Sequence, residues 1–215
     1  MDAMEALSGV EPESLTAEQK QKSLRAVNLI KLKKSGNLKV RVCDNGAPYR
    51  KFVPREEAKS LTINLEGFLA SMVIDVYEDR KVATFDIPGA YLQIDLPKEK
   101  FTLLLLEGKF VDIMGDINIT YKQNLRLKYS RKTLYIRIIK AIYGMIESYL
   151  LCYKLYMSVI KDIGFQINPY AICVANKYIN NKQCTIAWYV DDNKVSHMVQ
   201  EIIDDVISKA EERLQ

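Results

Sequence analysis

The chain has 215 residues, of which 48% are hydrophobic and 27% charged, with 9 Gly and 6 Pro. This composition is typical of a globular protein with a buried core, and it excludes collagen-like, low-complexity and largely disordered chains. The net charge of +4 predicts little by itself, no apolar run is long enough for a transmembrane helix, and the first 13 residues lack the pattern of a secretory signal.

The first third of the chain predicts a helix, a hairpin and a second helix. Thr16 and Gln19 have the spacing of a capping box, so we expect a helix over residues 17–34. Alternating polar and apolar residues before an Asp-Asn-Gly turn signal predict a hairpin over residues 37–51. Apolar residues at helical spacing predict a buried helix over residues 56–77.

The rest of the chain alternates strands and helices. We expect strands over residues 81–86, 100–106, 133–139, 172–179 and 184–190, the last two forming a hairpin. Residues 108–118 are rich in Gly, Asp and Asn and predict a loop, whereas residues 147–161 and 199–214 predict helices. This mixed order indicates an α+β fold, with a sheet covered by helices on one face.

Two stretches are strongly basic. Residues 20–59 contain twelve Lys/Arg against three Asp/Glu, and residues 121–140 contain seven Lys/Arg, no acid and three tyrosines. Such stretches could form a track for a polyanion such as a nucleic acid. The alternative is a solvated surface, and charge alone does not separate the two.

Cysteine and histidine limit the possible chemistry. The four cysteines are Cys43, Cys152, Cys173 and Cys184, and they show no Cys-x-x-Cys pairing, so we expect reduced thiols. His197 is the single histidine, which excludes a His-rich zinc centre and argues against a Ser-His-Asp mechanism.

Carboxylates follow two of the predicted strands. Asp86 ends the strand over residues 81–86, and Asp191 and Asp192 follow an apolar strand and precede Asn193. Adjacent carboxylates repel each other, so they need solvation or a cation. The alternative is that these acids only form turns. If the two strand ends lie side by side, three carboxylates meet at one site, where Mg²⁺ ions could support phosphoryl transfer.

Two motifs carry a resemblance to a known family. Asp86-x-x-x-Ala90-Tyr91-Leu92 and Tyr189-Val190-Asp191-Asp192 resemble motifs A and C of the reverse transcriptases of Copia-type LTR retrotransposons. Further segments resemble parts of this family in the same order, and the resemblance spans about residues 36–214. They are Lys39-Val40-Arg41, residues 101–110, residues 137–144, Gly164-Phe165 and Asn168-Pro169-Tyr170.

The resemblance implies a polymerase palm-like antiparallel sheet backed by helices, with a partial fingers subdomain and no thumb. The implied organisation is an N-terminal helical segment (residues 1–36), a fingers-like part (37–78) and a palm with motifs A to C (79–215) that is truncated at its C-terminus. A fingers insertion would occupy about residues 107–140 of the palm.

The implied activity is RNA-directed DNA polymerisation by two-metal catalysis with Mg²⁺ or Mn²⁺. Asp86, Asp191 and Asp192 would be the catalytic and metal-binding residues. The implied partners are an RNA or DNA template–primer, dNTP and other parts of a retroelement polyprotein, with no membrane. The setting would be a cytoplasmic retroelement particle or the nucleus.

The resemblance also implies a nucleotide-binding set. Tyr91 would contact the sugar, with core packing as its alternative, and the backbone at Gly89 and Ala90 would cradle the triphosphate. Arg41 and Lys39 would contact phosphates, with a solvated hairpin face as their alternative. Glu147 stands where the family has a Gln that touches the nucleotide.

Two other functions stay open at this point. The chain could be a catalytically silent retroelement remnant that acts as a nucleic-acid-binding module. It could also be a structural α+β domain whose acids are only turn residues, in which case Mg²⁺ should not change its thermal stability.

Overall fold

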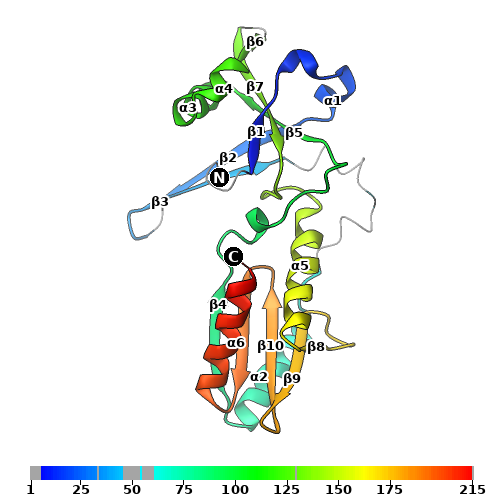
Figure 1. Cartoon of the computed structure of the whole chain (residues 1–215). Coiled ribbons are helices and arrows are strands. Elements are labelled where there is room, and N and C mark those ends of the chain that lie inside the picture. Colours follow the sequence, from blue (N-terminus) through cyan, green and yellow to red (C-terminus); the bar gives the residue numbers. More distant parts are fainter. Residues whose placement is uncertain (1–5, 33, 46–53, 55–60, 129, 215) are drawn as a thin grey trace. The chain divides into compact units, whose positions relative to one another are not determined.

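The structure is a computed structural model that describes residues 6–32, 34–45, 54, 61–128 and 130–214 (Figure 1). Two β-sheets and several helices confirm the α+β class. The chain forms two compact units, Met1–Ala58 with Ile94–Ser148 and Lys59–Gln93 with Tyr149–Gln215, whose bounds differ from the three expected segments. None of the described helices is long and apolar enough to cross a membrane.

The first unit is built on a six-stranded sheet of order β1-β7-β5-β2-β3, with β6 beside β7. All neighbours are antiparallel except β2 and β5. The strands are β1 (Leu7–Gly9), β2 (Leu24–Leu32), β3 (Leu38–Asp44), β5 (Thr102–Glu107), β6 (Arg126–Lys128) and β7 (Arg131–Ile138). The helices are η2 (Pro12–Ser14), α1 (Ala17–Gln21), α3 (Lys109–Ile117) and α4 (Thr120–Gln123).

The predicted N-terminal helical segment is wrong beyond its first turn. The capping box at Thr16 and Gln19 is present, but α1 ends at Gln21 and β2 follows. Pairing with β3 on one side and β5 on the other outweighs the helical spacing of the apolar residues in β2. The hairpin expected over residues 37–51 is also different, since β3 pairs with the preceding β2; residues 46–53 lie outside the described residues.

The loop expected over residues 108–118 is wrong, because α3 occupies most of it. Val111 and Gly115 are the buried positions of α3 and stand four residues apart, on one face of the helix. Of the Gly, Asp and Asn residues that indicated a loop, Gly108 and Asn118 cap the helix, and the side chain of Asp112 is half exposed.

The second unit is built on an antiparallel five-stranded sheet of order β4-β11-β10-β9-β8. Its strands are β4 (Lys81–Asp86), β8 (Gln166–Ile167), β9 (Val174–Ile179), β10 (Lys182–Tyr189) and β11 (Asp192–His197). Its helices are α2 (Leu65–Tyr77), η4 (Ala90–Gln93), α5 (Ser148–Asp162) and α6 (Gln200–Arg213).

Several predictions for this unit are confirmed. The strand over residues 81–86 is β4, and the helices expected over residues 147–161 and 199–214 are α5 and α6. The predicted C-terminal hairpin is formed by β9 and β10, with Asn180 and Asn181 at φ 52° and 60° in its turn. Strand β11 was not predicted. Cys152, Cys173 and Cys184 are free thiols, as expected.

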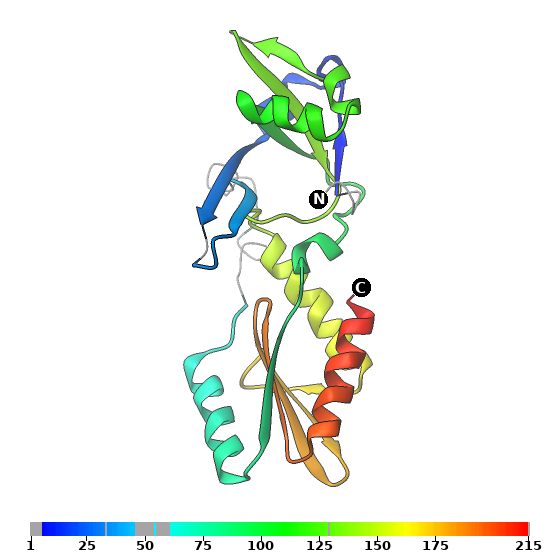
Figure 2. The ribbon, with the colours of Figure 1, turned by 90° about the vertical axis from the view of Figure 1, so that its left-hand side faces the viewer.

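Helices cover both faces of this sheet, so the expected one-sided covering is wrong. Figure 2 shows α2 on one face and α5 with α6 on the other. Trp188 of β10 packs against the rings of Tyr153 and Tyr156 of α5, with centroids 6.4 and 5.2 Å apart. On the opposite face, Lys194 of β11 points to α2.

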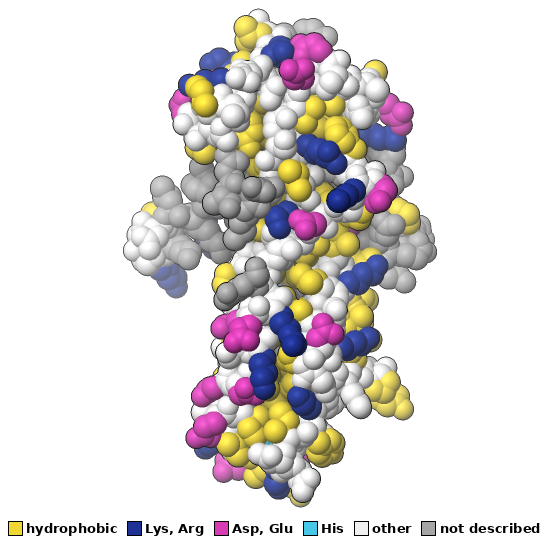
Figure 3. Space-filling model, in the orientation of Figure 1, with side chains coloured by type: hydrophobic (Ala, Val, Ile, Leu, Met, Phe, Trp, Pro, Cys, Tyr) yellow, Lys and Arg dark blue, Asp and Glu magenta, His cyan; other side chains and the backbone are white. Residues whose placement is uncertain are grey.

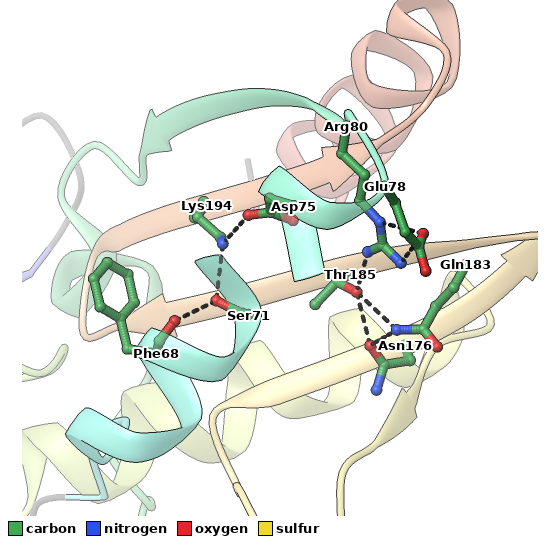
Figure 4. Close-up of polar contacts among 9 residues, drawn as sticks. All are labelled: Phe68, Ser71, Asp75, Glu78, Arg80, Asn176, Gln183, Thr185 and Lys194. Carbon is green, nitrogen blue, oxygen red and sulfur yellow. Dashed lines mark hydrogen bonds and ion pairs between the residues drawn. The ribbon is translucent and has the colours of Figure 1, made fainter. Parts of the chain in front are cut away.

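Helix α2 is not the buried helix that its sequence indicates. Its buried residues are Ser71 and Asp75, whereas Val73 and Val76 are 68% and 83% exposed. The reason is that polar side chains hold α2 to the sheet, as Figure 4 shows. The Lys194 ammonium forms an ion pair with Asp75, donates to Ser71 Oγ at 2.8 Å and lies 5.8 Å from the centre of the Phe68 ring.

We predict that Lys194→Met lowers the free energy of unfolding by about 3–5 kcal/mol, because it leaves the buried Asp75 carboxylate without its cation. Urea denaturation measures this. Lys209→Met is the matched control, since it breaks an exposed pair with Asp205 on α6 and should change stability by less than about 1 kcal/mol. Equal effects of the two substitutions would contradict a buried clamp, and the double change Lys194→Met with Asp75→Leu should recover most of the loss.

Candidate active site

The pairing of β4 with β11 brings the three predicted acids together. Asp192 is the direct antiparallel partner of Asp86, and Asp191 precedes it in the turn from β10. The Ile87 N–H donates to the Asp191 carbonyl at 3.2 Å, which extends the ladder past the ends of the strands. The sequence hypothesis that the two strand ends lie side by side is therefore confirmed for the backbone.

The turn that carries Asp191 is tight and strained. Tyr189 pairs with Asp192, so Val190 and Asp191 form a two-residue loop. Val190 has φ 59°, a conformation that β-branched residues rarely adopt. Strain of this kind persists only where the surrounding structure imposes it, and it is frequent at functional sites.

The acids are accessible to ligands. Asp86 and Asp192 are exposed and Asp191 is half-buried. Within the described residues, no three His, Cys, Asp or Glu side chains are grouped closely enough to hold a metal ion by themselves. Mg²⁺, however, is usually bound by one or two carboxylates together with substrate phosphates. The donor chemistry of this site suits a hard cation that a phosphate ligand helps to hold.

A cavity of about 760 Å³ adjoins the acids inside the second unit. Asp86 and Asp192 line it together with Lys194. Its apolar lining includes Ile63, Phe68, Trp188 and Tyr189. The two carboxylates thus stand at a hollow that can admit a ligand with an apolar part.

The segment after Asp86 is compact and already hydrogen-bonded. Gly89 has φ 62°, which favours glycine, and η4 begins at Ala90. Two of the backbone N–H groups expected to cradle a triphosphate have partners within the protein, because Ile87 donates to Asp191 and Ala90 donates to the Ile87 carbonyl. A triphosphate contact at Gly89 and Ala90 stays a prediction.

Tyr91 lies in the core. It is 2% exposed, and its ring packs edge-on against Tyr149 with centroids 5.6 Å apart. Burial raises the pKa of the Tyr91 hydroxyl well above its ordinary value, and Tyr149, Cys152 and the Asp191 carboxylate raise it further. This environment favours the packing alternative, and the sugar contact stays a prediction.

Asp191 also affects a thiol on α5. Burial raises the pKa of the Cys152 thiol to about 11, and the negative charge of Asp191 adds to the shift. Cys152 therefore stays a neutral thiol near neutral pH and does not act as a nucleophile for this site.

The other predicted nucleotide contacts belong to the first unit. Lys39 and Arg41 lie in β3, and their side chains are outside the described residues. Glu147 is 4% exposed and forms an ion pair with Lys100, so its negative charge is compensated. Their contacts with a nucleotide stay predictions.

The basic stretch over residues 121–140 is largely neutralised within the first unit. Lys122, Arg126, Lys132 and Lys140 form ion pairs with acids from other segments, and Arg137 lies over the Phe101 ring. Figure 3 shows acidic and basic side chains mixed on the face that it presents. The structure thus favours the solvated-surface alternative for most of this stretch.

Sequence reasoning missed the residues that support the acids. Asn193, Lys194 and Tyr149 contact or adjoin the site, and none of them was predicted to have a role there. No sequence signal indicated the first two, because polar residues after a turn are typical of an exposed segment. In the structure, five consecutive residues of β11 starting at Asn193 are buried although most are polar.

Comparison with known proteins does not add to these observations. No protein-family model matches the chain, and no curated protein matches it significantly.

We predict that Val190→Asn raises the free energy of unfolding by about 1 kcal/mol, because Asn adopts positive φ at lower cost than a β-branched residue. Chemical denaturation measures the change. Val82→Asn, at an exposed strand position, is the control and should not stabilise the protein. Destabilisation by both substitutions alike would show that Val190 is not strained.

Proposed function

We propose that the chain is part of an RNA-directed DNA polymerase of the Copia-type retrotransposon class. In this proposal the second unit is the palm and the first unit supplies fingers. The observation that carries it is the register of Asp192 opposite Asp86, with Asp191 in the adjoining turn. This register supports the proposal together with the motif resemblance, because it brings the backbone of Asp86 beside that of Asp192.

The proposed chemistry divides between the cations and the chain. Asp86 and Asp191 would hold the metal ions, with Asp192 beside them. When bound, Mg²⁺ or Mn²⁺ supplies charge that activates a primer 3′-hydroxyl and neutralises the leaving pyrophosphate. The chain would supply position, since the β4–β11 ladder sets the backbone of Asp86 opposite that of Asp192 and both residues are exposed, which would leave them open to the dNTP and the template–primer.

We predict that Asp191→Asn and Asp86→Asn each lower the rate of primer extension by about a thousandfold, because each removes a carboxylate ligand from a site where charge stabilisation dominates the barrier. The measurement is dNTP incorporation on an RNA template with Mg²⁺ or Mn²⁺. Asp204→Asn is the control, because this exposed acid on α6 accepts a hydrogen bond from Gln200 four residues away and lies on a helix apart from the three acids, so the substitution should leave the rate unchanged.

Two results would contradict the polymerase assignment. Equal extension by the wild type and Asp191→Asn would show that these acids are not catalytic. Binding of template–primer without any extension, unchanged by Asp86→Asn, would instead identify a silent nucleic-acid-binding module.

We also predict that Mn²⁺ raises the melting temperature of the wild-type protein and does so much less in Asp86→Asn or Asp191→Asn. A ligand that binds only the folded state stabilises it by RT ln(1 + L/Kd), where L is the free ligand concentration. Differential scanning fluorimetry with a Mn²⁺ series at a fixed dNTP concentration measures this. Equal shifts of the melting temperature in the three proteins would show that Mn²⁺ binds elsewhere. They would favour the alternative that the three acids are only turn residues.

A further inference from the structure

We propose that Asn193 is a positioning residue for the carboxylate site, acting through hydrogen bonds to the main chain beside the acids. This inference rests on the proposed function. Asn193 lies in β11 between Asp192 and Lys194, and its partners across the sheet are Trp188 and Phe85. It therefore lies in an interior strand of the sheet, between β4 and β10, one residue past Asp192.

The Asn193 amide connects both acid-bearing segments. Its Nδ2 donates to the Asp191 carbonyl at 2.8 Å and approaches the Phe85 carbonyl at 3.4 Å. Phe85 immediately precedes Asp86, so one side chain contacts the backbone next to each of the proposed metal ligands. Asn193 is 3% exposed, which protects both contacts from water.

The chemistry of the two contacts decides the orientation of the amide. Two carbonyl oxygens can only accept, so the group that faces them must be NH₂. The Oδ1 atom consequently points elsewhere and is buried without a partner among the described residues. An unpaired buried acceptor is unfavourable, so an apolar side chain would suit this position better if packing were its only role.

The Asp191 carbonyl receives a second donor, the Ile87 N–H at 3.2 Å. With the Asn193 amide, this carbonyl has two donors, and its two lone pairs are used. The peptide group that links Asp191 to Asp192 is thus held from both sides. Because Val190 strains the turn just before it, this double contact is what keeps the two acids pointing in a fixed direction.

The test compares Asn193→Leu with Asn176→Leu. Leucine matches asparagine in size but has no donor. Asn176 is a matched control, because its amide oxygen accepts from the side chains of Gln183 and Thr185 in the same sheet and not from a donor next to the acids, as far as the described residues show. Losing a hydrogen-bond partner behind a metal ligand typically costs about 10–100-fold. We expect this loss in kcat for Asn193→Leu, with the KM for dNTP little changed, and no comparable loss for Asn176→Leu.

A second readout is independent of catalysis. Mn²⁺ affinity, measured by water-proton relaxation with dNTP present and no primer, should fall about 10–100-fold in Asn193→Leu and stay at the wild-type value in Asn176→Leu. Asp191→Asn is the reference for the Mn²⁺ affinity that remains when one proposed metal ligand is lost. Because Mn²⁺ binding needs no polymerase activity, it tests Asn193 even if the wild type fails to extend a primer, a failure that would count against the proposed function alone.

A third variant tests the proposal if Asn193→Leu does not fold. Asn193→Thr retains strand propensity and one donor, so it should fold and give an intermediate loss of Mn²⁺ affinity. The proposal is overturned if Asn193→Leu and Asn193→Thr bind Mn²⁺ as the wild type does. It is also overturned if their losses only follow their melting temperatures, as those of a structural residue would.

Discussion

The antiparallel pairing of β4 with β11 is the constraint on which the site depends. It sets Asp192 opposite Asp86 and lets the Ile87 N–H reach the Asp191 carbonyl. Side chains alternate between the faces of a sheet, so a slip of one residue would move Asp192 and Lys194 to the opposite face. Register at this strand pair therefore decides both the grouping of the acids and the attachment of α2.

Strand β11 achieves this register with polar side chains. Lys194 binds Asp75 and Ser71 of α2, and Asn193 binds carbonyls of the neighbouring segments. At the end of the strand, His197 Nδ1 accepts from the Val199 N–H at the start of α6. Buried polar groups need specific partners, and each of these partners is available in only one register. The polar side chains of β11 thus give up some stability relative to an apolar strand and define the position of the acids, which we offer as the reason why this interior strand is polar.

The same feature explains which parts of the fold were predictable from sequence. Strand β4, the β9–β10 hairpin and helices α5 and α6 follow patterns of apolar residues and turn signals, and they were predicted within a few residues. β11 was not predicted, since its burial depends on side-chain bonds to distant residues. The orientation of α2 was wrong for the same reason, because its apolar residues face away from a polar sheet surface. The acids themselves were found because turn position and charge are local properties, whereas Asn193 and Lys194 act through tertiary contacts.

Ion pairs within the protein reduce the positive charge that the basic stretch over residues 121–140 offers to a nucleic acid. Lys122, Arg126, Lys132 and Lys140 each have an acidic partner, so the carboxylate partly compensates the positive charge that a phosphate would meet there. A phosphate gains less free energy from such a pair than from an unpaired cation. A basic stretch read from sequence therefore overstates the binding surface. In the proposed polymerase, the recognition of a template–primer would depend more on the geometry of the carboxylate site, where bound cations meet phosphates, than on the seven basic residues of 121–140.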